Sequence, residues 1–589
     1  MNSADGARLV RTLVRLTPGQ IAQRVRLRAQ RMALERRLPM ARWLLIGPDP
    51  GSAVGWPAGF RPLDARFWCD SPVRRTLRGG ELSLLGMTRS IAPANSVGTA
   101  DWQAADWEPA GVPLLWRFHL YYWDWAWALG AVGGQDPDAR AAFAAVWKSW
   151  HGVGLGRGQA WHPYPTALRA WSFCGVYRTL VEDSPIAAPF LADLAAHVGY
   201  LRRSLETDVG GNHLIKNLKA LAGSAVFFGD DALLARTLSR LRRQLAVQVL
   251  SDGGHYERAP FYHCQVLGDL IDVAGLLSTG GPDGEPDWLA DSIGKMREWL
   301  GAVLDPAGGV PLLNDGFPVS AEWLSCLRPA TPPASLLVML PDTGLVRAAV
   351  GRWQLLADVG LPCPRELPAH AHADTLGCLV HVDSEPFLID TGTSTYEPGA
   401  VRDYERSTAA HNTLEMDGAD STEVWGVFRA GRRARVTSLS TGLDASAGPV
   451  GTAADAVTIE AAHDGYRHLP GRPVHHRSWR VSADELRIDD TVTGHGRHTI
   501  AVRWHLAPDT LLRLGPGGAV VTAKTGDFDV AVTATAEARL SAGAAEVSLG
   551  FGRTATAPVL TCVLQCHLPV RISTVWRPGA PHPTTREPA

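Results

Sequence analysis

The chain has 589 residues but no run of about 18 to 20 apolar residues, so it contains no predicted transmembrane helix. Arginines interrupt every apolar run in the first 42 residues, and a standard secretory signal peptide is therefore not expected. Basic residues do not outnumber acidic ones, because the formal net charge is −2 at pH 7. This balance argues against nucleic-acid binding, which needs a concentrated basic surface.

Cysteines are few for this length and show no paired spacing, which excludes a disulfide framework and a four-thiolate zinc site. The eight are Cys69, Cys174, Cys264, Cys326, Cys363, Cys378, Cys562 and Cys566. The last two lie four residues apart in a strand-like segment. Both side chains should therefore face the same side of a sheet and pack there.

What the chain does contain is 46% hydrophobic residues, enough for a large core. Ala, Leu and Trp recur at helical spacing from about residue 114 to 340, and alternating strand patterns follow from about residue 345. A run of helices followed by a run of strands predicts two consecutive domains of an α+β multidomain protein, and not alternating βαβ units.

Composition also predicts the limits of five segments. They are basic amphipathic helices (1–45), an irregular connecting region (46–110), a helical domain (111–342), an antiparallel β domain (343–575) and a Pro-rich tail (576–589).

The first 42 residues carry ten arginines and two acidic residues and read as two amphipathic helices broken at Pro18 and Gly19. Three interpretations remain open for this segment: contact with a membrane surface, docking of a partner, or packing on the next domain. We expect a cytoplasmic protein that associates with a membrane through these helices if the first interpretation holds.

Asn212 and His213 stand at the start of a strongly helical run, after Gly210 and Gly211. Their side-chain donors and the positive end of the helix would together suit an anion such as a carboxylate. The alternative is that Asn212 only caps the helix.

A loop between two apolar helices is dense in titratable groups, a feature more often functional than structural. It contains Asp252, His255, Tyr256, Glu257, Arg258, Tyr262 and His263. Cations near Tyr262 would make its phenolate accessible for proton transfer, although tyrosines also serve as amphipathic core residues.

His370 and His372, with Asp374, would lie on one face of a strand. A predicted hairpin brings Asp390 back beside His372, and His411 follows in the next loop. Two imidazoles and one carboxylate make His372, Asp390 and His411 candidate zinc ligands, and a purely hydrogen-bonded cluster is the alternative.

The start of the helical domain is rich in aromatic residues that we expect mainly in the core. They are Trp116, Trp123, Trp125, Trp161 and Trp171. The polar residues between them, His119, Tyr121, Tyr164 and Arg169, would suit a groove that binds sugar rings and charged substituents.

Several of these motifs occur in an order that resembles the heparinase II/III and alginate lyase group of polysaccharide lyases. The motifs are "GGNH", "ERAPFYH", "NDG", "HAHADTLG", "LIDTGT", "RSTAAHNT" and "HDGY". The resemblance spans roughly residues 110 to 510 and implies an incomplete α/α toroid followed by an antiparallel β-sandwich, with the active site in the cleft between them.

The resemblance also implies roles for individual residues. Asn212 and His213 would neutralise a uronate carboxylate, Tyr262 would be the catalytic tyrosine, and His370 would complete the site. Tyr396 falls where some relatives place a second active-site tyrosine. His372, Asp390 and His411 would hold a structural zinc ion, and the substrate would be an acidic polysaccharide.

The chemistry of the residues agrees with β-elimination. Removal of the C5 proton of a uronate leaves a carbanion that delocalises into the carboxylate, so donors such as Asn212 and His213 stabilise charge that develops in the transition state. Tyr262 could be both base and acid, or share the task with His370 or Tyr396. Tyr164, His119, Arg169, Tyr256, Glu257 and Arg258 are the predicted substrate-binding residues.

Three alternatives stay open. A glycoside hydrolase on the same fold would need Asp252 with Glu257 or Asp315 as paired carboxylates. A C5-epimerase would remove the same proton without breaking the C4 bond. The arginine-rich start resembles relatives among genes for surface-polysaccharide synthesis, and a glycan-binding factor without catalysis is the third alternative.

Overall fold

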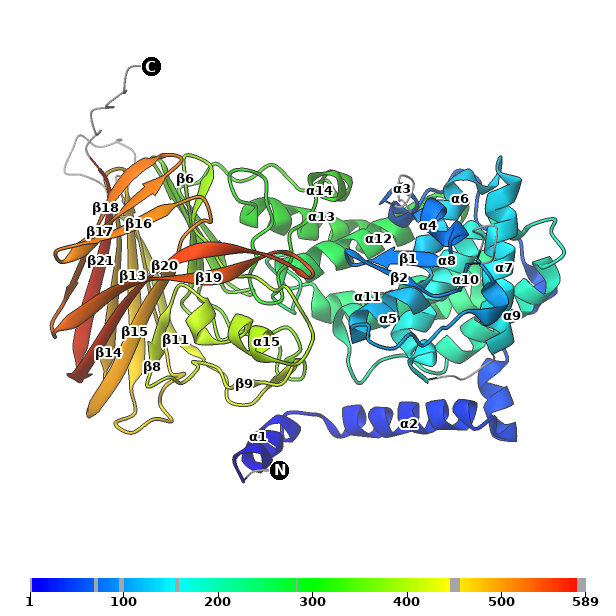
Figure 1. Cartoon of the computed structure of the whole chain (residues 1–589), viewed down its shortest axis with the longest axis horizontal. Coiled ribbons are helices and arrows are strands. Elements are labelled where there is room, and N and C mark those ends of the chain that lie inside the picture. The colour runs from blue at the N-terminus through cyan, green and yellow to red at the C-terminus, as the bar shows by residue number, and fades with distance from the viewer. Residues whose placement is uncertain are drawn as a thin grey trace, which may run out of the picture.

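The computed structural model of the chain describes residues 3–67, 73–94, 100–153, 158–281, 283–444 and 456–579. Helices fill the first half of the chain and antiparallel strands the second, as predicted, and the two halves lie side by side along the long axis (Figure 1). None of the described helices is long and apolar enough to cross a lipid bilayer. The described cysteines are all unpaired, and Cys562 and Cys566 are both buried, as their predicted common face requires.

Most helices of the first half are 14 to 21 residues long, and short turns connect them. The α-helices are α1 (Ser3–Leu13), α2 (Pro18–Glu35), α3 (Leu63–Phe67), α4 (Val73–Arg78), α5 (Leu114–Tyr122), α6 (Trp127–Gly133), α7 (Pro137–Val153), α8 (Pro163–Val176), α9 (Ala187–Leu201), α10 (Gly211–Phe228), α11 (Asp231–Gln248), α12 (Pro260–Gly280), α13 (Asp287–Val303) and α14 (Ala321–Leu327). Shorter elements are η1 (Pro39–Leu45), η2 (Pro50–Ser52), β1 (Glu81–Leu84), β2 (Met87–Ser90), η3 (Trp102–Ala104), η4 (Asp124–Ala126), η5 (Gly158–Trp161) and η6 (Tyr177–Val181).

Local sequence signals set the ends of the central helices. Gly229 ends α10 in the left-handed conformation (φ 64°), which glycine adopts without steric cost. The Asp230 side chain then caps α11 by accepting a hydrogen bond from the Leu233 backbone N (2.8 Å). Because α10 packs against α8, α11 and α12, its first turn is held at a fixed place in the helical half.

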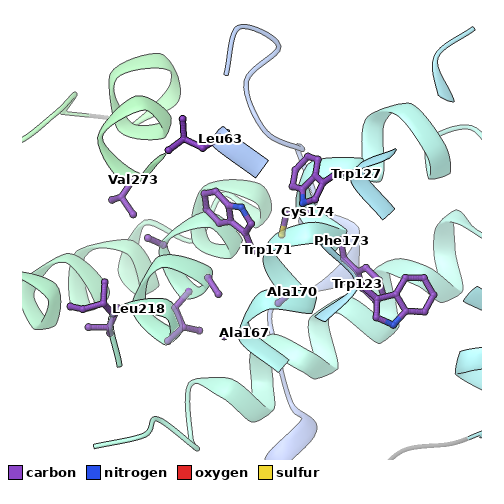
Figure 2. Close-up of a cluster of buried hydrophobic side chains, with 14 of the residues drawn as sticks. Leu63, Trp123, Trp127, Ala167, Ala170, Trp171, Phe173, Cys174, Leu218 and Val273 are labelled. Atoms are coloured by element: carbon purple, nitrogen blue, oxygen red, sulfur yellow. The ribbon is translucent and has the colours of Figure 1, made fainter. Parts of the chain in front are cut away.

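The five tryptophans predicted in the core are all buried, so that prediction is confirmed. Figure 2 shows Trp171, Trp127 and Trp123 around the middle of α8. A Cβ atom at Gly175 would lie 1.8 Å from the Trp127 ring, so only glycine allows that ring to approach the helix. The aromatic cluster therefore fixes α6 against α8 and supports the helices that carry the site.

The second half consists of antiparallel sheets of five, eight, four and two strands. The strands are β3 (Leu337–Leu340), β4 (Leu345–Val350), β5 (Trp353–Asp358), β6 (Cys378–Val382), β7 (Glu385–Leu388), β8 (Leu414–Met416), β9 (Val424–Trp425), β10 (Arg429–Ala430), β11 (Val436–Asp444), β12 (Ala456–His463), β13 (Val474–Ser482), β14 (Leu486–Thr493), β15 (Arg497–His505), β16 (Leu511–Gly515), β17 (Gly518–Ala523), β18 (Gly526–Ala534), β19 (Ala538–Gly550), β20 (Arg553–His567) and β21 (Val570–Pro578). Between β7 and β8 lie the helix α15 (Ala400–Glu405) and the turn η7 (Thr408–Ala410).

One core joins the three larger sheets. Fully buried tryptophans come from each of them: Trp353 from β5, Trp479 from β13, Trp504 from β15 and Trp576 from β21. Burial of such large apolar side chains is the main stabilising contribution to this half.

The predicted segment limits differ from the structure in three places. The segment predicted as irregular, 46–110, contains α3, α4 and the β1–β2 hairpin. Strand β3 starts at Leu337, before the predicted start of the β domain at 343, and β21 ends at Pro578, inside the predicted tail. Elements this short show too few periods for a hydrophobic pattern to reveal them. Residues 580–589 of the predicted tail lie outside the described residues.

Residues 3–46, which we call the N-terminal arm, pass along both halves of the molecule (Figure 1). In α1, the Arg11 guanidinium donates to Glu423 of the strand half (2.8 Å), and Thr12 Oγ1 accepts from Trp425 Nε1 (3.1 Å). In α2, the buried Gln20 amide donates to the carbonyl oxygens of Asp208 (2.9 Å) and Glu366 (3.4 Å). The arm therefore bridges a loop of the helical half and a loop of the strand half.

Replacing Gln20 with methionine should lower the free energy of unfolding by about 1–3 kcal/mol, because carbonyl oxygens of both halves lose their donor and the capping box of Gln20 with Thr17 is lost, while the side-chain volume is kept. Urea unfolding followed by tryptophan fluorescence measures this loss. Gln23→Met is the matched control, since Gln23 donates only to the Leu205 carbonyl of the helical half. Equal effects of the two substitutions would contradict a bridging role for Gln20.

Candidate functional site

The first turn of α10 is built around two glycines and two side chains of the loop before α12. Gly210 and Gly211 have positive φ angles of 72° and 53°. A Cβ atom at Gly211 would lie 1.8 Å from Glu257 Oε1, so a larger residue cannot take its place. The backbone N–H groups of Gly211 and Asn212 donate to the Tyr256 hydroxyl (2.9 Å) and to Glu257 (2.7 Å). Close approach of the loop therefore requires the glycine pair.

Asn212 is buried, and its side-chain Nδ2 donates to both carboxylate oxygens of Glu257 at 3.1 and 3.3 Å. Its Oδ1 is buried without a partner. The amide is thus held rigidly at the helix N-terminus by a carboxylate. The expectation that Asn212 only caps the helix is wrong, because its side chain contacts Glu257 and makes no capping bond.

His213 is the partly exposed neighbour, with a third of its side chain accessible. Its Nδ1 lies 3.1 Å from Glu206 Oε1, and the Tyr164 ring packs on the imidazole at 4.3 Å. His162 lies 3.4 Å from the same Glu206 oxygen. Burial would raise the pKa of Glu206, but the two histidines and Asn217 lower it below its usual value. Glu206 therefore stays ionised and orients two imidazoles.

Tyr262 lies in the first turn of α12, which Pro260 begins. Its hydroxyl is hydrogen-bonded to the Tyr396 hydroxyl at 2.8 Å, and its ring stacks on the His370 imidazole with the centroids 3.8 Å apart. Burial, and next the charge of Asp315, raise the pKa of Tyr262 above its usual value. The phenol is therefore neutral at rest, and the expectation that nearby cations make its phenolate accessible is wrong for the resting protein.

His370 is held between two buried carboxylates. Its Nε2 lies 3.0 Å from Glu257 and its Nδ1 lies 2.9 Å from Asp315. Burial lowers the pKa of His370, but hydrogen bonds to Asp315 and Glu257 outweigh burial and raise it to about 9. The same contact lowers the pKa of Glu257 to about 2 against the effect of its burial. The ring under Tyr262 is thus an imidazolium with both N–H groups already used.

Asp315 is the centre of the buried polar network. It is fully buried and accepts a bidentate pair of hydrogen bonds from Arg402 (2.6 and 3.0 Å). His370, His372 (3.0 Å) and Thr393 (3.3 Å) complete its partners. Burial would raise the pKa of Asp315, and Arg402 and the histidines lower it well below its usual value. Asp315 thus links the two histidines of one loop to α15.

The predicted metal ligands lie close together but are not arranged as a closed metal site. The histidine segment 368–377 is a loop and not the expected strand, although the β6–β7 hairpin follows it as predicted. The rings of His372 and His411 are 5.3 Å apart. Asp390 accepts from His411 Nδ1 (2.8 Å) and the Gly392 N–H (3.0 Å). Among the described residues, no group of three or more His, Cys, Asp or Glu side chains is placed to hold a metal ion.

Two nitrogen atoms nevertheless fit a metal. His372 Nδ1 and His411 Nε2 are both buried and have no hydrogen-bond partner in the part of the chain that the structure describes. The opposite nitrogen of each ring is held by a carboxylate, Asp315 for His372 and Asp390 for His411. Metal-binding histidines typically have their second nitrogen held in this way.

Two of the predicted substrate-binding residues are buried and cannot contact substrate directly. Arg169 is fully buried, and its guanidinium donates to His197 Nε2 and to the carbonyls of Tyr121 and Ala160, so the prediction for Arg169 is wrong. Helical spacing among tryptophans could not show that α8 is covered on every side.

The prediction for Glu257 is also wrong. Glu257 is buried against Asn212 and His370 and has almost no exposed surface for a sugar. The Arg258 guanidinium donates to the Thr343 carbonyl of the strand half, but Arg258 is only partly buried and stays a candidate for substrate contact.

Tyr256, Tyr164 and His119 remain candidates for substrate contact because each is only partly buried. His119 packs on the Tyr122 ring at 4.7 Å, and Tyr122 packs on Tyr164 at 5.7 Å. Burial raises the pKa of Tyr164, and the nearby phenols of Tyr122 and Tyr262 add to this effect. An aromatic row therefore leads from His213 along α5 and α8.

Sequence reasoning missed Glu206, and it did not find the roles of Asp315 and Arg402. The only signal for Asp315 was the "NDG" motif, and Glu206 and Arg402 are single charged residues without a recognisable spacing. Their partners are distant in sequence: Arg402 is 87 residues from Asp315.

The sequence model described as "Heparinase II/III N-terminus" matches residues 155–331, and the model described as "Heparinase II/III-like, C-terminal" matches residues 332–573. No curated protein sequence matches the chain.

Solved structures of several lyases are similar in fold. A crystal structure of heparinase III has a TM-score of 0.69 at 14% identity, covering 84% of this chain and 81% of that one. The heparan sulfate lyase HepC of Pedobacter heparinus has a TM-score of 0.59 at 16% identity, covering 94% and 88%. The chondroitin AC lyase of Streptomyces coelicolor A3, in complex with chondroitin sulphate, has a TM-score of 0.51 at 12% identity, covering 94% and 83%. At these identities the likeness establishes the fold alone.

Proposed function

The chain belongs to the heparinase II/III-like family of polysaccharide lyases, and we propose that it cleaves a uronic-acid-containing polysaccharide by β-elimination. The observation that carries this proposal is the contact of the Tyr262 phenol with the Tyr396 hydroxyl and with the imidazolium of His370. We further propose that the helical half is an incomplete α/α toroid, that the sheets form a β-sandwich, and that substrate enters between them.

In the proposed reaction, Tyr262 loses its phenolic proton to solvent when substrate binds, and the resulting phenolate takes the C5 proton of the uronate. The C5–H electron pair forms the C4=C5 double bond, the C4–O bond breaks, and the phenol returns its proton to the leaving oxygen. The stacked His370 cation and the Tyr396 hydroxyl stabilise the phenolate. Asn212 and His213 donate to the substrate carboxylate, where negative charge grows in the transition state.

Buried carboxylates orient the groups that take part in the proposed reaction. Glu257 holds the Asn212 amide through both of its carboxylate oxygens, so an N–H of Asn212 must turn from Glu257 toward the substrate carboxylate when substrate binds. Glu206 holds one nitrogen of His213 and leaves the other for the carboxylate. Since both nitrogens of His370 are used by Glu257 and Asp315, we assign His370 the role of a buried cation and not of a base.

The arrangement of carboxylates disfavours a glycoside hydrolase, which needs a carboxylic acid with a raised pKa. Both carboxylates have lowered pKa values: His370 lowers the pKa of Glu257, and Arg402 followed by His370 lowers that of Asp315, in each case against the effect of burial. Asp252 accepts from the Thr343 backbone N (2.7 Å) and hydroxyl (2.9 Å) and is structural.

One assay tests the proposed function against its alternatives. The protein is incubated with a panel of uronic-acid polymers while ultraviolet absorbance is followed, because only elimination creates a double bond conjugated to the carboxylate. New reducing ends without absorbance would indicate hydrolysis. Solvent deuterium at C5 without either signal would indicate epimerisation, and binding without any turnover would indicate a glycan-binding factor.

We also propose that His372, Asp390 and His411 hold a structural zinc ion that fixes the loop presenting His370. Support comes from the two buried imidazole nitrogens that have no partner among the described residues. The Asp390 carboxylate, which here holds His411 Nδ1 and the Gly392 N–H, would have to turn to become the third ligand. When bound, the ion would supply structural cross-linking of three loops and no chemistry at the substrate.

Metal analysis of the purified protein should find about one zinc ion per chain, and a chelator should lower the melting temperature. His411→Asn should lose the metal. His498→Asn is the matched control, because His498 is a buried histidine paired with Asp417 outside the cluster. A metal-free protein whose melting temperature does not respond to chelator would refute the zinc site.

A further inference from the structure

The N-terminal arm exposes an unusual share of the large apolar side chains of the molecule. Among the described residues, 21 large apolar side chains are exposed, and nine of them lie in the 44 residues of the arm. They are Val10, Leu13, Val14, Ile21, Val25, Met32, Leu38, Trp43 and Ile46. Scattered exposed apolar residues are normal, but a concentration of this kind marks an interaction surface.

The exposed residues of α2 form a stripe. Gln20, Leu27 and Leu34 are buried against the rest of the chain. Ile21, Val25, Arg28 and Met32 follow one another at spacings of three or four residues, so they share the opposite, outward face of the helix. Val25 in this stripe is 65% exposed. We call these four residues the outer stripe.

The N-terminal arm carries a strong excess of positive charge. Residues 1–42 contain ten arginines and only Asp5 and Glu35 as acidic residues. Arg11 and Arg24 pair with Glu423 and Asp208 of the two halves and so hold the arm in place. Arg28, Arg36, Arg37 and Arg42 are exposed on the surface. The free face of the arm is therefore both basic and apolar.

The end of the arm carries an exposed tryptophan. Trp43 in η1 is 57% exposed, and the Arg203 guanidinium lies 4.8 Å from its ring centre. Tryptophan beside arginine is typical of the headgroup level of a membrane, where an amphipathic ring has one apolar and one wet side. Ile46 is exposed three residues further along.

We propose that the N-terminal arm binds an anionic lipid surface, with the outer stripe of α2 and Trp43 buried at the headgroup level. A basic face matches anionic headgroups in charge, and a stripe of alternating apolar and basic residues matches the interface in polarity. The inner face stays bound to both halves, so docking leaves the fold intact. The inference concerns a surface distinct from the candidate active site and does not rest on the proposed reaction.

The experiment is co-sedimentation of the full chain with vesicles. Vesicles of phosphatidylcholine alone are compared with vesicles that also contain phosphatidylglycerol, at low and high salt. We expect binding to the anionic vesicles only, weakened by salt. Arg28→Glu should weaken binding about tenfold or more, because it reverses a charge at the surface, and Val25→Ser should weaken it about tenfold through lost apolar burial.

Arg240→Glu on α11 is the matched control. Arg240 is exposed on a basic helix of the helical half but has no such apolar stripe around it, so its reversal should leave binding unchanged. Melting temperatures equal to that of the parent protein show that the variants are folded. Equal binding to neutral and anionic vesicles, or equal effects of Arg28→Glu and Arg240→Glu, would overturn the proposal. Self-association that is lost in Val25→Ser, without vesicle binding, would assign the face to a second copy of the chain.

Discussion

Replacing Tyr262 with phenylalanine is expected to abolish β-elimination, with a loss in kcat of at least about 10³-fold, and to leave substrate binding and the fold intact. The substitution removes one oxygen atom, the proposed acceptor and donor of the transferred proton. General acid–base catalysis typically contributes 10²- to 10⁴-fold, and one group that serves both steps should stand at the upper end. Ultraviolet absorbance of the product measures the loss.

The fold should tolerate this change because, among the described residues, the Tyr262 hydroxyl bonds only to Tyr396, and the phenylalanine ring can still stack on His370. Tyr121→Phe is the matched control. Tyr121 is a buried tyrosine whose hydroxyl donates to the Trp107 carbonyl (2.9 Å) at a distance from the site. Loss of this hydroxyl should lower the free energy of unfolding by about 1 kcal/mol and leave the activity unchanged.

Two results would distinguish the role of Tyr262 from the proposed reaction as a whole. Retained elimination in Tyr262→Phe would remove Tyr262 from its role and would leave family membership and lyase chemistry unaffected. Absence of elimination in the parent protein on every uronate polymer, together with tight binding, would instead contradict the proposed reaction.

Much of the candidate site could be predicted from the sequence because its residues stand at recognisable local positions. Asn212 follows a glycine pair at a helix start, and Tyr262 follows a proline at another, so helix signals place both. The hairpin of β6 and β7 could be predicted from its strand patterns and turn. Helix and hairpin signals of this kind determine which side chains lie at the end of a helix or strand.

The rest could not be predicted because it depends on contacts between distant segments. Spacing cannot show that Glu206 would hold both His162 and His213, or that Arg402 would pair with Asp315. Arg169 illustrates the opposite error. Its position among aromatic residues suggested a sugar-binding groove, but the same pattern also describes a helix buried on all sides.

Replacing Asp315 with asparagine is the second substitution with a large expected effect. The free energy of unfolding should fall by about 3–5 kcal/mol, because the buried guanidinium of Arg402 loses its only bidentate carboxylate. Activity of the folded fraction should fall as well, about 10²-fold or more, since His370 loses one of the two carboxylates that keep it charged under Tyr262. Urea unfolding and initial rates at low temperature measure the two effects.

The strand half offers a matched control for the stability effect. Asp490 is a second fully buried carboxylate with a bidentate arginine, Arg477 (2.7 and 2.9 Å), and a histidine, His475 (2.6 Å). Its partners lie on β13. Arg477 also donates to the carbonyls of Leu376 (2.9 Å) and Asn412 (2.6 Å), but among the described residues neither partner is bonded to Tyr262 or His370. Asp490→Asn should therefore destabilise the protein by a similar amount and leave the rate per folded molecule unchanged.

The comparison of Asp315→Asn and Asp490→Asn isolates the role of charge at His370 from general destabilisation. Equal rates per folded molecule would show that Asp315 is only structural, and the assignment of His370 as a cation would fail. Asp315 is also hydrogen-bonded to His372, a proposed zinc ligand. The metal content of the same samples therefore tests whether the substitution disturbs the zinc site. If activity falls while zinc is retained, the effect lies at His370. The retained metal would show that the loop geometry is preserved, which leaves the lost charge of His370 as the cause.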